Sequence, residues 1–98
     1  MMFRFAAERS LRDVSRRLRR AREELAVLDE QLQVFRETAE DTRIRALVSE
    51  TPLASREAEE ASRHVDAMLR AREALERSIA DLVKRQDDLL EQLPPALG

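Results

Sequence analysis

Residues 11–39 read LRDVSRRLRRAREELAVLDEQLQVFRETA, and the spacing of the apolar residues in this stretch decides the fold. The steps between successive apolar residues alternate between three and four, which is the repeat of a coiled-coil seam. The seam positions are Leu11, Val14, Leu18, Ala21, Leu25, Leu28, Leu32, Phe35 and Ala39. We therefore expect this stretch to form one long α-helix that buries a narrow apolar face.

A second series with the same spacing follows later in the chain. It consists of Ala54, Ala58, Ala61, Val65, Met68, Leu75, Ile79, Leu82, Leu89 and Leu93, with Arg72 and Gln86 filling two seam positions. A polar residue at a seam position usually fixes the register of a coiled coil at some cost in stability. The composition agrees with long solvent-exposed helices, since 39% of the residues are charged and the one glycine is the last residue.

The sequence Ser49-Glu50-Thr51-Pro52 separates the two series. Proline lacks a backbone donor and disfavours a helical residue before it, so the first helix should end near Ser49 or Glu50. Thr51 can cap the second helix, with Pro52 at the favoured first position, and so short a corner needs no glycine. We expect helices near residues 8–49 and 52–93, a turn at 49–52 and a non-helical tail at 94–98.

Folding the chain at this turn aligns the two series in opposite directions. The numbers of facing seam residues then add to 103 or 104, as for Phe35 and Met68. The same register pairs Arg72 with Leu32 and Gln86 with Leu18. The predicted fold class is all-α, a single domain of residues 1–98 in which two long helices form an antiparallel coiled-coil hairpin. Domain-swapped pairing with a second copy gives the same layers and is the alternative.

Four apolar residues near the turn do not fit the seam. They are Ile44, Leu47, Val48 and Leu53. Either the chain wraps locally and buries them, or they form an exposed tip patch that binds a protein partner.

Further apolar residues recur along the flanks of the two helices. They are Val27 and Val34 on the first helix and Leu69, Val83 and Leu90 on the second. Such stripes widen a seam toward a four-helix bundle, so we expect a homodimer of hairpins. At the opposite end from the turn, Phe3, Phe5 and Leu97 either cap the bundle or insert into a partner or a membrane surface.

Arginine is concentrated near the N-terminus. Residues 1–22 contain eight arginines against Glu8 and Asp13. A phosphate-binding function would use Arg9, Arg12, Arg16, Arg19 and Arg20. Nucleic acid is nevertheless not the favoured partner, because Tyr and Trp are absent and the pI is acidic. The simpler interpretation is a solvated face compensated by Glu8, Glu23, Glu24 and the acidic residues of 81–91.

Sequence motifs for catalysis are not found. His64 is the sole histidine and is expected at the surface, since no cysteine or HExxH motif accompanies it. There is no glycine-rich phosphate loop and no nucleophile elbow. We expect a protein that is not an enzyme and binds no cofactor or metal. The lack of cysteine and of a long apolar run favours a small cytoplasmic protein of bacterial type, without a membrane span.

The function that the sequence favours is a non-catalytic coiled-coil module for protein interaction or assembly. In this hypothesis it self-associates along its shaft and presents its tip to an unidentified protein partner. One alternative is an accessory protein that binds a polyanion, either nucleic acid or an anionic surface, through the arginine block. Another is a regulatory hairpin bound to a large machine such as RNA polymerase or the ribosome.

Overall fold

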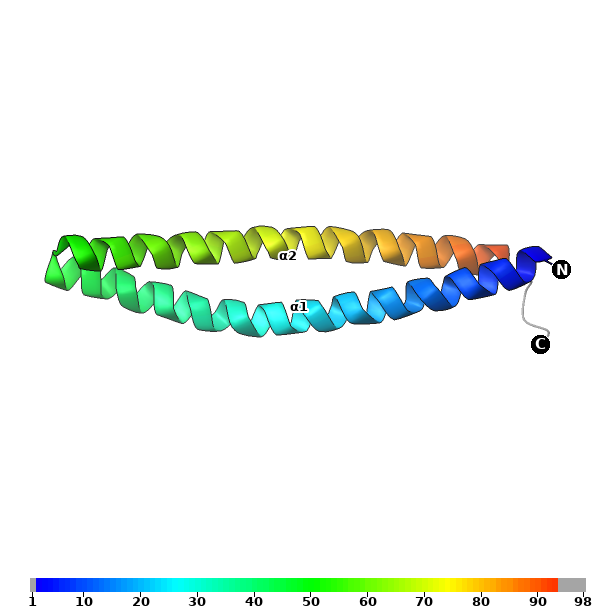
Figure 1. Cartoon of the computed structure of the whole chain (residues 1–98), viewed down its shortest axis with the longest axis horizontal. Coiled ribbons are helices and arrows are strands. Elements are labelled where there is room, and N and C mark those ends of the chain that lie inside the picture. The colour runs from blue at the N-terminus through cyan, green and yellow to red at the C-terminus, as the bar shows by residue number, and fades with distance from the viewer. Residues whose placement is uncertain (1, 94–98) are drawn as a thin grey trace. The chain divides into compact units, whose positions relative to one another are not determined.

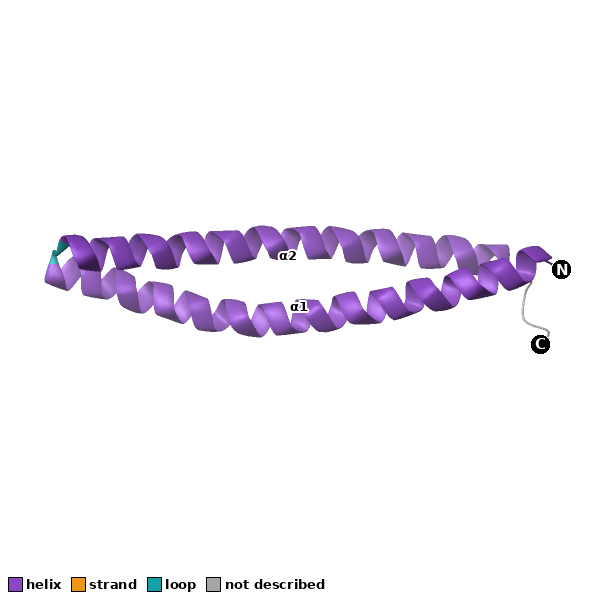
Figure 2. Cartoon of the chain, viewed as in Figure 1, coloured by secondary structure: helices purple, strands orange, loops and turns teal. Residues whose placement is uncertain are grey.

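The computed structural model describes residues 2–93, with side chains from Phe5 onward. Two α-helices, α1 (Met2–Ser49) and α2 (Pro52–Gln92), run in opposite directions and pack against each other as a hairpin (Figures 1 and 2). Residues 2–93 contain no strand. The expected all-α helical hairpin is therefore confirmed. The predicted tail at 94–98 and the side chains of Phe3 and Leu97 lie outside the described residues.

The first helix begins earlier than the sequence pattern suggested. It starts at Met2 rather than near residue 8, because no glycine or proline interrupts residues 2–7 and Ala6 and Ala7 favour helix. Ala7 is also buried, one seam step before Leu11, so the seam extends further toward the N-terminus than expected. The sequence contained a signal for this extension, because the four-residue step from Ala7 to Leu11 continues the alternation of three and four.

The turn uses a cap at each helix end. Thr51 caps α2 as predicted: its Oγ1 accepts a hydrogen bond from the backbone N–H of Ala54 at 3.1 Å. At the end of α1, the N–H of Glu50 donates to the carbonyl of Ala46 at 3.1 Å, and Glu50 has a φ of 51°. This is the left-handed C-terminal cap that glycine usually occupies. The corner thus forms without a glycine, as expected, although Glu50 occupies a conformation that favours one.

Replacing Glu50 by glycine is expected to raise the free energy of unfolding by about 0.5–1 kcal/mol. A residue with a Cβ is strained in the left-handed region by about 1–2 kcal/mol, and the extra chain entropy of glycine in the unfolded state cancels part of the gain. Urea unfolding followed by circular dichroism measures the change. The same substitution at Ser49, which is still helical, should lower stability. Equal effects at the two positions would contradict the assigned cap.

The chain divides into two compact units. Unit 1 comprises residues 1–24 and 75–98, and unit 2 comprises residues 25–74. The buried residues are Ala7, Val14, Leu18, Ala21 and Leu89 in unit 1, and Leu32, Ala54 and Met68 in unit 2. Every seam position expected from the sequence is buried or half-buried, and no described charged or polar residue is fully buried. Each unit is therefore held together by the predicted apolar seam.

The register of the seam differs from the predicted one. The contacts between helices are Ser15–Gln86 in unit 1, and Asp29–Arg72, Phe35–His64 and Arg45–Glu57 in unit 2. Their residue numbers add to between 99 and 102, and the helix ends on either side of the turn, Ser49 and Pro52, add to 101. These totals fit a register in which the numbers of facing seam residues add to 100. This register is shifted by about half a heptad from the predicted one, in which they add to 103 or 104. Phe35 thus lies beside His64 rather than Met68, and the predicted facing pairs were wrong.

Candidate interaction surfaces

Each unit has two flanks, which heptad positions distinguish. With the seam at positions a and d, positions e and b lie on one flank of a helix and positions g and c on the other. In an antiparallel pair the e positions of both helices share one side. We refer to this as the e side and to the opposite one as the g side. The contacts agree: Asp29 and Ser15 are e positions, whereas Arg45, Glu57 and His64 are g positions.

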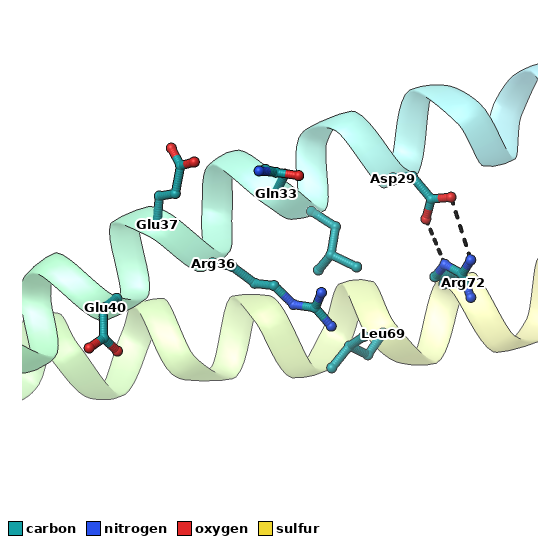
Figure 3. A pocket seen from close by; sticks show the side chains of 8 residues that line it. Asp29, Gln33, Arg36, Glu37, Glu40, Leu69 and Arg72 are labelled. Atoms are coloured by element: carbon teal, nitrogen blue, oxygen red, sulfur yellow. Dashed lines mark hydrogen bonds and ion pairs between the residues drawn. The ribbon is translucent and has the colours of Figure 1, made fainter.

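On the e side of unit 2, Arg72 leaves the seam and pairs with Asp29. Its Nε lies 2.6 Å from Asp29 Oδ1 and its second guanidinium nitrogen 3.4 Å from Oδ2. The pair closes one end of an open hollow of about 620 Å³, in which Arg36 extends toward Leu69 (Figure 3). A bidentate pair of this kind is geometrically demanding, so it favours one register over its neighbours.

The other polar seam residue also has a partner. In unit 1, Gln86 Nε2 donates to Ser15 Oγ at 3.1 Å. No buried polar side-chain atom among the described residues lacks a hydrogen-bond partner. Both polar seam residues of α2 therefore reach a polar side chain at an e position of α1, where the predicted register had placed them against leucines.

Ion pairs at the surface of unit 2 shift the pKa values of Asp29, Glu40 and Arg43. The hydrogen bond from Arg72 lowers the pKa of the Asp29 carboxyl, with smaller help from the charges of Arg72 and Arg36. The hydrogen bond from Arg43 lowers the pKa of Glu40, and Glu40 in turn raises the pKa of Arg43. Each shift stabilises the charged form at neutral pH, so none of these groups is poised to transfer protons there.

The Asp29–Arg72 pair should give unit 2 a pH-dependent stability. Because the folded pKa of Asp29 is lower than its unfolded value, the pair stabilises the folded state at pH values above the unfolded pKa, about 3.9. This contribution is lost as the pH falls through the folded pKa. We expect Asp29→Asn to be less stable than the wild type at pH 7 and to approach it near pH 2.

Denaturant unfolding at the two pH values measures this difference. Glu37→Gln removes an exposed carboxylate from the same helix and serves as the matched control. A deficit of Asp29→Asn that persists unchanged at pH 2 would show that the pair does not stabilise the protein through charge.

All four residues of the predicted tip patch are exposed in the hairpin. Val48 is 80% exposed, Leu47 66%, Leu53 63% and Ile44 48%, so the chain does not wrap around the turn to bury them. Val48 and Leu53 both occupy c positions and lie on the g side of unit 2, while Leu47 and Ile44 occupy b and f positions. The tip patch thus surrounds the end of unit 2 and is not confined to one side.

The five residues of the predicted oligomer stripe do not share a face. In unit 2, Val27 and Val34 occupy c positions on the g side, whereas Leu69 occupies an e position and lines the hollow on the e side. In unit 1, Val83 and Leu90 also occupy e positions. Val27 and Val34 are exposed, while Leu69 and Val83 are half-buried. Only the two valines are thus available as an open surface on the g side.

Three alanines that the sequence analysis did not single out complete this surface. Ala67, Ala71 and Ala74 of α2 are exposed and occupy c and g positions on the g side of unit 2. Val34 and Ala67, and likewise Val27 and Ala74, have numbers that add to 101, so each pair is level across the two helices. We define the shaft patch as Val27, Val34, Ala67, Ala71 and Ala74. The signal in the sequence was the spacing of three and four between the alanines.

An acidic layer separates the shaft patch from the tip patch. Asp41 and Glu60 occupy the c positions between them, and both are exposed. Unit 2 therefore presents two distinct apolar surfaces on its g side.

The arginine block lies on the outer face of α1 in unit 1. Arg9, Arg12, Arg16, Arg19 and Arg20 are all exposed and occupy b, c and f positions, which point away from α2. Asp13 pairs with Arg16 at 3.7 Å and with Arg17 at 3.1 Å. Among the described side chains, no ion pair joins these arginines to Glu23, Glu24 or the acidic residues of 81–91. Apart from those with Asp13, the described ion pairs therefore leave these arginines exposed on the outer face of α1.

The structure also shows the surroundings of His64 and Phe5 and bears on metal binding and membrane insertion. His64 is exposed and its ring lies against that of Phe35, with centroids 4.2 Å apart. Within residues 2–93, no cluster of three His, Cys, Asp or Glu side chains could hold a metal ion. No helix in this part of the chain has a stretch long and apolar enough to cross a membrane. Phe5 is 61% exposed.

Comparison of the chain with models of protein families, with curated proteins and with solved structures gives no significant match.

Proposed function

We propose that this chain is a non-catalytic coiled-coil module that associates with a second copy of itself through the shaft patch and offers its tip patch to a protein partner. One observation carries the proposal. Among the described side chains, six of the eight exposed large apolar ones belong to unit 2: Val27, Val34, Ile44, Leu47, Val48 and Leu53. Single exposed apolar residues are common on protein surfaces, but grouped ones mark sites of protein interaction.

The shape of the shaft patch supports a second copy as its occupant. α1 contributes branched valines and α2 contributes small alanines to the same side of unit 2. A two-fold axis parallel to the helices places α1 of one copy opposite α2 of the other, so the valines of one copy meet the alanines of its partner. Such an arrangement packs large residues against small ones, and it adds two helices to the existing pair to form a four-helix bundle.

The tip patch supports a different partner. It is separated from the shaft patch by Asp41 and Glu60, and Glu50 lies within the turn beside it. Unit 2 as a whole contains 11 acidic residues and seven arginines. A partner that covers the tip would therefore combine an apolar contact with a basic rim, since opposite charges around an apolar centre favour the encounter.

Replacing Val27 and Val34 together by serine tests self-association. Serine and valine have similar helix propensities, so the hairpin should remain helical. Four valines leave the dimer interface, each contributing about 1 kcal/mol because half of its surface is already covered, so dimerisation should weaken by roughly 10²–10³-fold. Sedimentation equilibrium across micromolar concentrations measures the association constant.

A matched control removes at least as much exposed apolar surface elsewhere on unit 2. Ile44→Ser with Leu47→Ser changes two exposed residues of the tip patch and should leave the association constant within about threefold of the wild type. A wild-type protein that stays monomeric at high micromolar concentration would refute self-association. If both double variants lowered the association constant equally, the interface would not be specific to the shaft patch.

A further inference from the structure

We infer that the outer face of α1 in unit 1 binds the phosphate backbone of double-stranded nucleic acid without reading its sequence. The face, termed the arginine face, consists of Arg9, Arg12, Arg16, Arg19 and Arg20. This activity is separate from the interactions proposed for unit 2, because it uses other residues and another chemistry.

The arginine face is a continuous line of guanidinium groups. Arg9, Arg12, Arg16 and Arg19 are three or four positions apart on one helix, so their side chains emerge from the same face about 4.5–6 Å apart along the axis, and Arg20 lies beside this line, four positions after Arg16. From Arg9 to Arg19 the line extends about 15 Å. Along that length a duplex presents about four phosphates on each strand. The spacing therefore allows several arginines to contact phosphates at the same time.

The local charge is unbalanced, which distinguishes this face from the rest of the surface. Between residues 9 and 20 the outward b, c and f positions hold five arginines and one acid, Asp13. Asp13 lies near Arg16 and Arg17, and Arg9, Arg12, Arg19 and Arg20 make no ion pair within the described side chains. Arginine also binds phosphate through two parallel hydrogen bonds, which adds geometry to the attraction of charge.

The outer face of α2 in unit 2 shows the contrast. Arg56, Arg63 and Arg70 recur there at f positions one heptad apart, and all are exposed. Glu59, Glu60, Asp66 and Glu73 occupy neighbouring b and c positions. The basic stripe of α2 is thus balanced by acids, whereas the arginine face is not. The two stripes form a matched pair for an experiment.

A duplex fits the arginine face better than a membrane or an unpaired strand. A helix that binds a lipid surface inserts apolar side chains from the face that meets the lipid. The outward positions from Arg9 to Arg20 hold none, and Val14 and Leu18 are buried in the seam. Proteins that hold single strands stack bases on aromatic rings, and the arginine face contains no aromatic residue.

The test is fluorescence anisotropy of a labelled 20-base-pair DNA of mixed sequence, titrated with the full chain between 50 and 200 mM salt. With five phosphate contacts the logarithm of affinity should fall with the logarithm of salt at a slope of about −4.5, or roughly 500-fold over this range. A second duplex of unrelated sequence should bind within about threefold. The triple variant Arg12→Gln, Arg16→Gln, Arg19→Gln should reduce the slope to about −2 and the affinity at 50 mM on the order of 10³-fold.

Two further variants separate local charge from net charge and from folding. Lysine at the same three positions should keep the slope near the wild-type value, because the phosphate contacts remain charged. Arg56→Gln, Arg63→Gln, Arg70→Gln removes the same total charge from the balanced stripe and should change the affinity by less than about threefold. Circular dichroism confirms equal helicity in all variants.

Three results would overturn the inference. The first is that the wild type does not bind the duplex at 50 mM salt. The second is that the triple glutamine variant at Arg56, Arg63 and Arg70 loses as much affinity as the one at Arg12, Arg16 and Arg19, and the third is that the lysine variant loses binding while remaining helical. Binding to vesicles of phosphatidylserine and phosphatidylcholine without binding to DNA also overturns it and assigns the face to a membrane surface.

Discussion

Replacing Leu89 by alanine is expected to lower the free energy of unfolding by about 3 kcal/mol. Leu89 is 2% exposed and is the most deeply buried large side chain among the described residues. Its truncation removes apolar contacts from the seam of unit 1 and leaves a cavity that two packed helices cannot close. Urea unfolding followed by circular dichroism measures the loss, provided that protein concentration is held constant because association adds to stability.

The neighbouring residue provides the control for this prediction. Leu90 is of the same type and on the same helix, but it is 51% exposed. Leu90→Ala should therefore cost less than about 1 kcal/mol. If the two variants were equally unstable, Leu89 would not be a seam residue and the packing described for unit 1 would be incorrect.

Enlarging Ala54 to leucine is expected to lower the free energy of unfolding by about 2 kcal/mol. Ala54 is 7% exposed and is the first seam residue after the turn, two positions beyond the start of α2. The nearby seam residues Thr42, Ala46 and Ala58 are also small, so the helices have room to approach closely only while these side chains stay small. A larger side chain must push α1 and α2 apart or adopt a strained rotamer.

The same substitution at an exposed alanine isolates the effect of packing. Ala80 lies in the middle of α2 and is exposed, and alanine and leucine have similar helix propensities. Ala80→Leu should change stability by less than about 0.5 kcal/mol. Comparable losses at both positions would mean that Ala54 is not packed against α1.

Much of the fold could be predicted because the spacing of apolar residues within each helix shows which of its faces is buried. Apart from Ala7, the alternation of three and four identified the seam positions of both helices, and these residues are buried or half-buried in the structure. The turn could also be predicted, because the hydroxyl of Thr51 and the ring of Pro52 specify a helix start by local chemistry alone. Both features depend on residues close together in sequence.

The register could not be predicted from the seam in the same way. A seam with steps of three and four matches its partner again after every half heptad, so totals near 100, 103.5 and 107 are equally consistent with the apolar pattern. What selects among them is the length of the turn and the polar pairs Asp29–Arg72 and Ser15–Gln86. The register could have been identified from the sequence by requiring that each polar seam residue of α2 face a polar residue at an e position of α1.

The interaction surfaces were predicted in part for a related reason. The four apolar residues expected at the tip are exposed. The grouping of the apolar residues outside the seam depends on which flanks of two helices share a side, and this follows only when both helices are placed together. Val34 and Leu69 were thus assigned to one stripe although they lie on opposite sides of unit 2. The alanines opposite the valines were overlooked because small residues give a weak hydrophobic signal.

The short turn has a consequence for how such a chain can change in length. With Glu50 bonded back to Ala46 and Thr51 capping α2, the corner leaves no slack to absorb an extra residue. An insertion in one arm alone would bring every layer beyond it out of step with the other arm. Length variants that keep the fold should gain or lose a whole heptad in both arms together, so lengths should differ by multiples of about 14 residues.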